Sequence, residues 1–218
     1  RYLTGEQFAK LTGVELPTYR LCHARDLFVF STFTGLGRAD LANLTSENIV
    51  TEPDGSRWIH IERQKTKAEC HIKLLDIPSR IIDKYKGEGK DGKLFFVPAT
   101  SSLCRSLKMI EEQCKLGCHL TFYMARHSFA TLICLGNGVP IETISRMMGH
   151  SSIRTTQIYA EITNQKVNRD LLRLADTTKN QYSLPDDKMT PRVYQCGRYN
   201  GWKEEEDKDD NRTSGKAM

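Results

Sequence analysis

The chain has 218 residues with 32 basic and 27 acidic side chains, which gives a net charge of +5 at pH 7. Residues 177–218 hold equal numbers of basic and acidic side chains, so the whole excess lies in residues 1–176. A chain of 218 residues suffices for one large domain or two small ones. A basic folded part favours a polyanionic partner, although many ordinary soluble proteins carry a similar charge.

No signal peptide opens the chain, and no apolar run is long enough to span a membrane. The seven cysteines are an odd number, and several lie on apolar faces, as free thiols do in a reducing compartment. They are Cys22, Cys70, Cys104, Cys114, Cys118, Cys134 and Cys196. A metal site at Cys114, Cys118 and His119 is the alternative, but no second ligand pair stands at zinc-site spacing. The sequence therefore predicts a cytoplasmic protein without metal, cofactor or membrane association.

Three helices are predicted in the first 44 residues. Thr4, followed three residues later by Gln7, is a capping signature, and we expect a helix from there to about Thr12. Pro17 begins a second helix, which is apolar enough up to Phe33 to lie at the centre of a core. Residues 34–37 end this helix, and residues 38–44 form the third, short one.

The hydrophobic period then changes from that of a helix to that of a strand. Trp58, His60 and Glu62 alternate with Ile59, Ile61 and Arg63, which is the periodicity of a strand. The predicted strands are 49–50, 58–63 and 70–75, with turns at 53–55 and 64–68. This is a small antiparallel sheet in an otherwise helical chain.

Helices return after Pro78. The predicted ranges are 79–85, 101–118, 122–135, 141–148, 155–161 and 164–176, and the last is amphipathic. From residue 177 the periodicity fails and a run of charges follows, so we expect residues 177–218 to be a mostly disordered tail. The expected fold class is mainly α with a small antiparallel β-sheet (α+β).

Three short boxes stand in a specific order. Residues 34–41 read TGLGRADL, residues 123–131 read YMARHSFAT, and Met148-Gly149-His150 is followed by Thr155-Thr156 and Tyr159. A lone tyrosine is most often a packing residue, but these boxes together are specific. Over residues 4–176 the chain resembles the catalytic domain of the tyrosine recombinases, the phage integrase family, and the resemblance implies that domain's fold.

The resemblance implies DNA strand exchange without a metal ion or nucleotide cofactor. Tyr159 would attack a phosphodiester, form a 3′-phosphotyrosyl link and release a 5′-hydroxyl. The 5′-hydroxyl of a second strand would then attack this link and rejoin the DNA. Arg126 and His150 would bind the scissile phosphate. Lys65 would be the general acid for the leaving oxygen. Lys67 is a rival for that role, and an ordinary surface or helix-end role is the alternative for each residue.

The second box departs from the family pattern at its first position. The family usually has histidine there, and this chain has Tyr123. A tyrosine hydroxyl still donates to a phosphate oxygen, and Tyr123 shares a helix face with Arg126. His127, directly after Arg126, is expected in a structural or supporting role.

The first box departs more seriously, because Gly37 stands where the family usually has an arginine. Arg38 is one replacement, although the neighbouring position on a helix points about a quarter-turn away. Arg63 is the other, because it lies two residues before Lys65 and would share a strand face with it. We prefer Arg63. The third alternative is a DNA-binding protein that kept the fold and lost catalysis.

The resemblance also implies partners and domains. Residues 1–176 would be the catalytic domain, and an N-terminal core-binding domain would be missing from this fragment. The partner would be double-stranded DNA with specific sites in a mobile genetic element, with DNA-bending accessory proteins. Helix 164–176 would join protomers into a homotetramer on DNA or else pack on its own domain. A type IB topoisomerase-like activity shares this chemistry, but the extra domains expected of it are not seen in this sequence.

Overall fold

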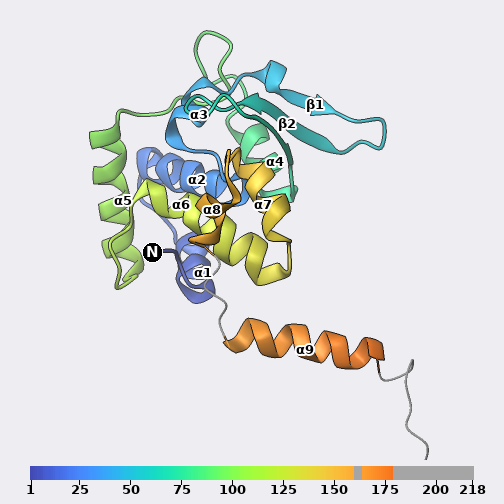
Figure 1. Ribbon diagram of the computed structural model, residues 1–218. Coiled ribbons are helices and arrows are strands. Elements are labelled where there is room, and N and C mark those ends of the chain that lie inside the picture. The colour runs from blue at the N-terminus through green and yellow to red at the C-terminus, as the bar shows by residue number, and fades with distance from the viewer. Residues whose placement is uncertain (160–163, 179–218) are drawn as a thin grey trace, which may run out of the picture. The chain divides into compact units, whose positions relative to one another are not determined.

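The computed structural model describes residues 1–159 and 164–178. Two compact units divide the chain, Arg1–Leu171 and Leu172–Met218, and the boundary between them falls inside the last helix. The first unit holds all three boxes (Figure 1). Of the second unit, the description covers only residues 172–178.

The first unit is mainly helical with one small sheet, which confirms the predicted fold class. A 3-10 turn, η1 (Ser46–Asn48), precedes the first strand, and a π-helix, η2 (Phe129–Cys134), and a second 3-10 turn, η3 (Leu135–Asn137), follow α6. The α-helices and strands are α1 (Gly5–Gly13), α2 (Tyr19–Thr34), α3 (Arg38–Asn43), β1 (Ile49–Thr51), β2 (Arg57–Glu62), β3 (Glu69–Lys73), α4 (Asp76–Lys84), α5 (Thr100–Cys114), α6 (Phe122–Ser128), α7 (Ile141–Met148), α8 (Ile153–Gln157) and α9 (Asn164–Thr178).

Helix α2 is the central helix of the core. It packs against α4, α5 and α6, which surround it in Figure 1, and its apolar side chains, Phe28 and Phe30 among them, are buried. The helix ends at Gly35, whose φ of 68° is in the left-handed region. A Cβ at Gly35 would lie 2.5 Å from the Phe129 ring. Gly35 of the first box is therefore required both by its backbone conformation and by the lack of space for a side chain.

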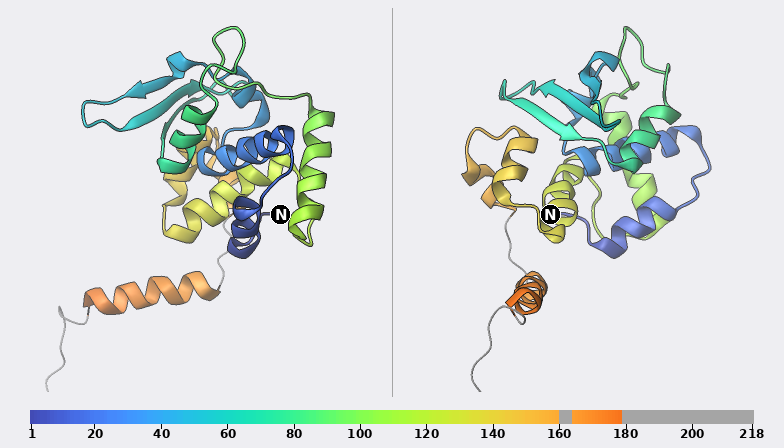
Figure 2. Two further views of the ribbon diagram at one scale, coloured as in Figure 1. Left: turned by 180° about the vertical axis from the view of Figure 1, so that it is seen from behind. Right: turned by 90° about the vertical axis from the view of Figure 1, so that its right-hand side faces the viewer.

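The sheet is antiparallel, with the order β1-β2-β3. Ile59 pairs with Ile49 on one side and Ile72 on the other, and the buried isoleucines of β2 and β3 face the core. Both views in Figure 2 show the sheet at one end of the helical body. The turn between β2 and β3, which carries Lys65, is tied to the third box because the Thr66 hydroxyl donates to the carbonyl oxygen of Gly149 at 3.0 Å.

Several predicted helix boundaries were wrong. Helix α4 begins at Asp76 rather than residue 79, because Pro78 lies in the first turn, where no backbone N–H is needed. Helix α5 ends at Cys114 rather than residue 118, because Lys115 adopts a φ of 49°. Helix α8 begins at residue 153 and ends at Gln157, so Tyr159 lies in the turn that follows it. Residues 160 and 161 of that prediction lie outside the described residues.

The predicted helix 122–135 is one α-helix followed by other helical forms. Helix α6 ends at Ser128, and the π-helix η2 and the turn η3 complete the range. π-Helical turns are rare and cluster at functional sites. Here the wider turn follows directly after Arg126 and His127.

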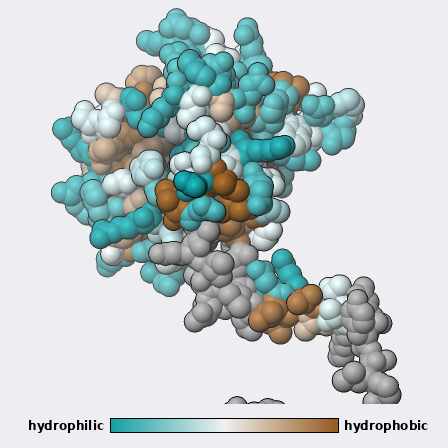
Figure 3. Space-filling model, viewed as in Figure 1, coloured by the Kyte–Doolittle hydropathy of each residue, from teal (hydrophilic) through white to brown (hydrophobic). Residues whose placement is uncertain are grey.

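The last predicted helix is present as α9, two residues longer than expected. Leu171, Leu172 and Leu174 are exposed on it, and Figure 3 shows hydrophobic surface on this helix. Residues 179–218 of the predicted tail lie outside the described residues. None of the helices within the described ranges is long and apolar enough to cross a membrane.

Candidate active site

Arg126, near the end of α6, is held by three acceptors. Its Nη1 donates to the carbonyl oxygen of Gly35 at 2.5 Å, and its Nη2 donates to the carbonyl oxygen of Met148 at 2.7 Å. Nη2 also lies 2.9 Å from Nε2 of His150. A guanidinium has five N–H donors, so Nε and one hydrogen of Nη1 remain for a ligand. The first and third boxes thus meet on the arginine of the second.

The charge of Arg126 is not neutralised by these contacts. Burial lowers the pKa of its guanidinium to about 10, and the nearby Arg63 adds to this effect, while Tyr159 and Asp40 oppose it. The side chain stays protonated at neutral pH. A half-buried cation bonded to neutral acceptors is poised for an anion.

His150 follows α7 and the left-handed Gly149. Its Nδ1 lies 2.8 Å from the Thr156 hydroxyl, on α8, and its Nε2 faces Arg126. Burial, then the charges of Arg126 and Arg63, lower the pKa of His150 to about 4. The imidazole is therefore neutral at pH 7.

Gly149 makes room for Arg63. A Cβ at Gly149 would lie 2.6 Å from Cγ of Arg63 and 2.6 Å from Sγ of Cys70, and its φ of +63° also disfavours a side chain. A residue larger than glycine therefore does not fit at position 149, because the Arg63 side chain from the hairpin passes too close.

Arg63 lies directly after β2 and is buried. Its Nη2 forms an ion pair with Oδ2 of Asp40 at 3.3 Å, and its Nη1 is buried without a hydrogen-bond partner in the described part of the chain. Asp40 also accepts from the backbone N–H of Gly37 at 3.3 Å and of Gln64 at 3.1 Å. Asp40 therefore ties Arg63 and the hairpin to the first box.

The prediction that Arg63 and Lys65 share a face was wrong. The strand ends at Glu62, so its alternation does not extend to these residues, and Arg63 is buried while Lys65 is exposed in the turn. Among the residues described, Lys65 has no hydrogen bond or ion pair. Lys67, its rival, pairs with Glu62 at 3.3 Å.

Arg38 is not part of this cluster. Its Nη2 donates to the carbonyl oxygen of Pro98 at 3.1 Å, on a loop before α5. Gly37 contributes its backbone alone and caps α3. Of the two candidate replacements for the missing arginine, Arg63 is the one that lies near Arg126 and His150, as its effect on both pKa values shows.

Tyr159 is buried, with 4% of its surface exposed. Its backbone N–H donates to the carbonyl oxygen of Thr156 at 3.0 Å, and its ring stacks on His150 with centroids 6.2 Å apart. Burial and the Tyr123 hydroxyl raise the pKa of Tyr159 to about 12, although Arg126 opposes them. Arg63, Arg126, His150 and Tyr159 are called the Arg126 cluster below.

Tyr123 and His127 border this cluster from α6. The His127 ring makes edge contacts with Tyr123 at 4.5 Å and with Tyr159 at 4.8 Å between centroids. Tyr123 itself is exposed, and burial lowers the pKa of His127. A cavity of about 510 Å³ adjoins Tyr159 and His127.

No group of three or more metal-ligating side chains is found in the ranges that the structure describes. At the cysteines considered for a metal, burial raises the pKa of both Cys114 and Cys118. Nδ1 of His119 lies 3.5 Å from Oε2 of Glu111.

The order of the boxes and their meeting at Arg126 agree with a match of residues 1–166 to the Phage integrase family. The chain belongs to this family. The predicted resemblance is thereby confirmed.

Curated relatives in this family include two proteins called tyrosine recombinase XerA. That of Saccharolobus solfataricus is 28% identical over 149 residues, which are 68% of this chain and 49% of the relative. That of Thermococcus onnurineus is 29% identical over 174 residues, 74% of this chain and 58% of the relative. The chain thus spans about half the length of these family members.

Solved structures share the fold. The crystal structure of XerA recombinase has a TM-score of 0.63 and 20% identity, and covers 80% of this chain and 65% of its own. That of XerH site-specific recombinase bound to difH substrate has a TM-score of 0.62 and 20% identity, and covers 78% of this chain and 53% of its own.

Sequence reasoning missed three residues that hold the site together. They are Asp40, Thr66 and Thr156, which connect Arg63, Gly149 and His150 to their neighbours. Asp40 and Thr156 stand inside the first and third boxes, and their near-complete burial is the signal that a single sequence does not give.

Proposed function

We propose that this chain is the catalytic part of a site-specific DNA recombinase or integrase of a mobile genetic element, which cleaves and rejoins DNA through a 3′-phosphotyrosyl intermediate. The observation that carries the proposal is the stacking of Tyr159 on His150, which is itself bonded to Arg126. Family membership and the box order support the same reaction.

The reaction exchanges one phosphodiester for another. The Tyr159 oxygen bonds to phosphorus and loses its proton, the bond from phosphorus to the 5′-oxygen breaks, and that oxygen takes up a proton. Rejoining reverses these steps with a new 5′-hydroxyl, so no nucleotide cofactor is needed. Negative charge grows on the two non-bridging oxygens in the transition state of each step, and preorganised cations lower the free energy of that transition state.

The proposed roles follow from the donors that each residue still has. Arg126 offers Nε and one hydrogen of Nη1, and Arg63 offers its unpartnered Nη1 in place of the first-box arginine. His150 and Tyr123 would join them at the scissile phosphate, and His127 would support Tyr159. Exposed Lys65 would protonate the leaving oxygen.

Tyr159 is almost fully buried in the free protein, with 4% of its surface exposed. The adjoining cavity gives its ring space to move. Bound DNA would draw the phenol toward the phosphate, and the phenol already lies close enough to Arg126 for that charge to lower the pKa of Tyr159. Burial in the free protein would thus guard against attack without a substrate.

The proposed partner is double-stranded DNA at specific sites, as in the XerH structure with its difH substrate. We further propose a homotetramer on DNA joined through α9, whose exposed leucines suit such a contact, together with DNA-bending accessory proteins. The place of action would be the cytoplasm, and an N-terminal core-binding domain would complete the protein.

One observation favours a second candidate, a DNA-binding protein without catalysis. Gly37 removes the side chain of the first-box arginine. Against it, Arg63 supplies a second cation within the Arg126 cluster, and its Nη1 has no hydrogen-bond partner among the described residues.

Covalent trapping separates the two. The chain would be incubated with nicked duplexes, randomised around the nick, from which the fragment bearing the 5′-hydroxyl diffuses away. We expect a covalent protein–DNA adduct on a denaturing gel, absent in Tyr159→Phe and unchanged in the control Tyr19→Phe. DNA binding without any adduct would establish the second candidate instead.

A further inference from the structure

We propose that Thr156 is a positioning residue that fixes the tautomer of His150, and through it the guanidinium of Arg126. Thr156 touches neither the nucleophile's hydroxyl nor the expected phosphate position by any contact described above. Its role in the reaction rests on the proposed function, but its effect on His150 does not.

The tautomer follows from the chemistry of the neighbours. An arginine side chain donates hydrogen bonds and accepts none. Nε2 of His150, 2.9 Å from Nη2 of Arg126, must therefore be the unprotonated nitrogen. In a neutral imidazole the proton is then on Nδ1, which donates to the Thr156 hydroxyl oxygen at 2.8 Å.

The position of Thr156 leaves little freedom for other arrangements. The residue is fully buried, so water does not replace its hydroxyl. A buried N–H without an acceptor is costly, and with the proton on Nε2 instead, that N–H would face the donors of Arg126. The charged and titratable groups around His150 are Arg126, Arg63 and Tyr159, and none of them accepts from Nδ1.

Thr156 also connects the phosphate-binding side chains to the nucleophile. Its side chain binds His150, and its backbone carbonyl accepts from the N–H of Tyr159 at 3.0 Å. A single buried residue on α8 thereby holds both the ring that orients Arg126 and the backbone of the nucleophile. A substitution of the Thr156 side chain removes the contact with His150 and leaves the backbone bond to Tyr159 in place.

The test uses Thr156→Val, which keeps the shape of the side chain and removes the acceptor. Nitrogen-15 spectra of the imidazoles in the DNA-free chain report which nitrogen carries the proton. We expect His150 in the wild type to be protonated on Nδ1, and the Nδ1–H fraction to fall in Thr156→Val. Adduct formation should slow by about 10- to 100-fold.

Two further variants separate positioning from folding. Thr156→Ser keeps the hydroxyl and should restore both the tautomer and the rate, and the exposed neighbour gives a matched control, Thr155→Val, which should change neither. A wild-type His150 protonated on Nε2 would overturn the proposal, as would Thr156→Val with unchanged tautomer or unchanged rate. If the wild type forms no adduct, the proposed function fails, while the spectra still decide what Thr156 does.

Discussion

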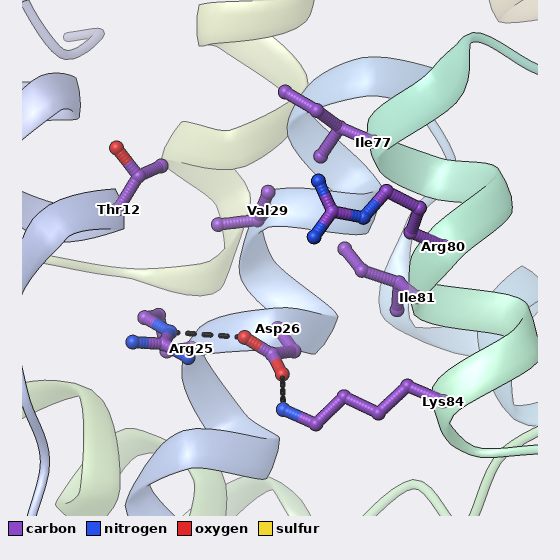
Figure 4. Close-up of a pocket in the computed structure, with 8 residues that line it drawn as sticks. All are labelled: Thr12, Arg25, Asp26, Val29, Ile77, Arg80, Ile81 and Lys84. Carbon is purple, nitrogen blue, oxygen red and sulfur yellow. Dashed lines mark hydrogen bonds and ion pairs between the residues drawn. The ribbon is translucent and has the colours of Figure 1, made fainter.

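Two clusters of charged side chains lie in the same helical body and differ in how their charges are paired. In the Asp26 cluster, between α2 and α4, Asp26 accepts from Arg25 at 2.9 Å, Lys84 at 2.5 Å and Tyr85 at 2.8 Å. Figure 4 shows the first two contacts beside a pocket of about 370 Å³. Every oxygen of the carboxylate is bonded.

The Arg126 cluster is paired differently. Its two guanidiniums lie near one carboxylate, Asp40, which pairs with Arg63, and Nη1 of Arg63 is buried without a hydrogen-bond partner in the part of the chain described. The pKa of Asp26 is lowered although burial opposes this, because its partners hold the charge. The pKa values of Arg126 and His150 are lowered first by burial and then by the neighbouring positive charges, Arg63 for Arg126 and both arginines for His150. Each set thus holds two cations and one carboxylate, but both cations of the Asp26 cluster bind its carboxylate, whereas Arg126 is bonded to two carbonyl oxygens and the neutral His150 ring.

The largest expected effect concerns the proton that the leaving 5′-oxygen takes up, for which the Arg126 cluster has no donor at neutral pH. Its arginines do not release protons, and His150, with a pKa of about 4, is neutral. The leaving oxygen must therefore be protonated from outside, and Lys65→Ala should slow cleavage by about 10²–10⁴. The measurement is the rate of adduct formation.

The leaving group provides the control. A duplex with sulfur in place of the bridging 5′-oxygen releases a thiolate, which needs no proton. Lys65→Ala should cleave this duplex at nearly the wild-type rate, and Lys67→Ala should cleave both duplexes normally. A defect of Lys65→Ala that persists on the sulfur substrate would exclude the general-acid role.

Removing the unpartnered donor sharpens the comparison next. Arg63→Ala should reduce the rate of adduct formation by about 10², because a phosphate donor is lost, whereas Arg38→Ala should cleave normally. Gly37→Arg in the Arg63→Ala background should restore part of the rate. Its Cβ would stand 3.4 Å from Oδ2 of Asp40, an ordinary contact. Normal cleavage by Arg63→Ala and loss in Arg38→Ala would reverse the assignment.

Breaking the Asp26 cluster should affect stability instead of catalysis. Asp26→Asn leaves Lys84 and Arg25 without their anion and should reduce the free energy of unfolding by about 2–3 kcal/mol. Denaturant unfolding measures this, and the cleavage rate per folded molecule should not change. The exposed pair of Arg57 and Asp83 is the control, since Asp83→Asn should cost less than about 1 kcal/mol. A stable Asp26→Asn variant with slow cleavage would refute the distinction.

The smallest effect separates the clusters by pH. The unfolded chain binds a proton at His150 below its ordinary pKa of 6.5, and the folded chain does so only near 4, so stability should fall as pH falls between these values. The stabilisation by Asp26, whose pKa is lowered, is present above its ordinary 3.8 and is lost as pH falls below that value.

Unfolding curves at several pH values test this order. His150→Phe should flatten the fall between pH 6.5 and 4 in part, because burial also lowers the pKa of His23 and His127. Asp26→Asn should flatten only the fall at lower pH. If His150→Phe leaves the upper range unchanged, His150 is not neutral in the folded protein.

Much of the fold could be predicted from the sequence, because it depends on local patterns. The apolar run of α2 and the alternation around Trp58 gave their elements correctly. The π-helix η2 could not be predicted, since no local signal marks it. The ends of α4 and α5 depend on single residues, Pro78 and Lys115, whose conformations only the packed chain decides.

The site was predictable in its residues more than in its contacts. Box order brought Arg126, His150 and Tyr159 into view, and sequence position raised Arg63 as a replacement cation. Strand alternation gave the wrong reason for it, because Arg63 lies beyond β2. The support from Asp40 and Thr156 arises from contacts between separate elements, which a single sequence does not record.

The central claim is that Tyr159 of the Arg126 cluster is the nucleophile, and mapping the trapped adduct tests it most directly. Trypsin places Tyr159 in a peptide of residues 155–166 and its neighbour Tyr123 in a peptide of residues 116–126. After nuclease trimming, mass spectrometry should find a nucleotide joined through its 3′-phosphate to the first peptide. A nucleotide on the second peptide, or on neither, would contradict the account.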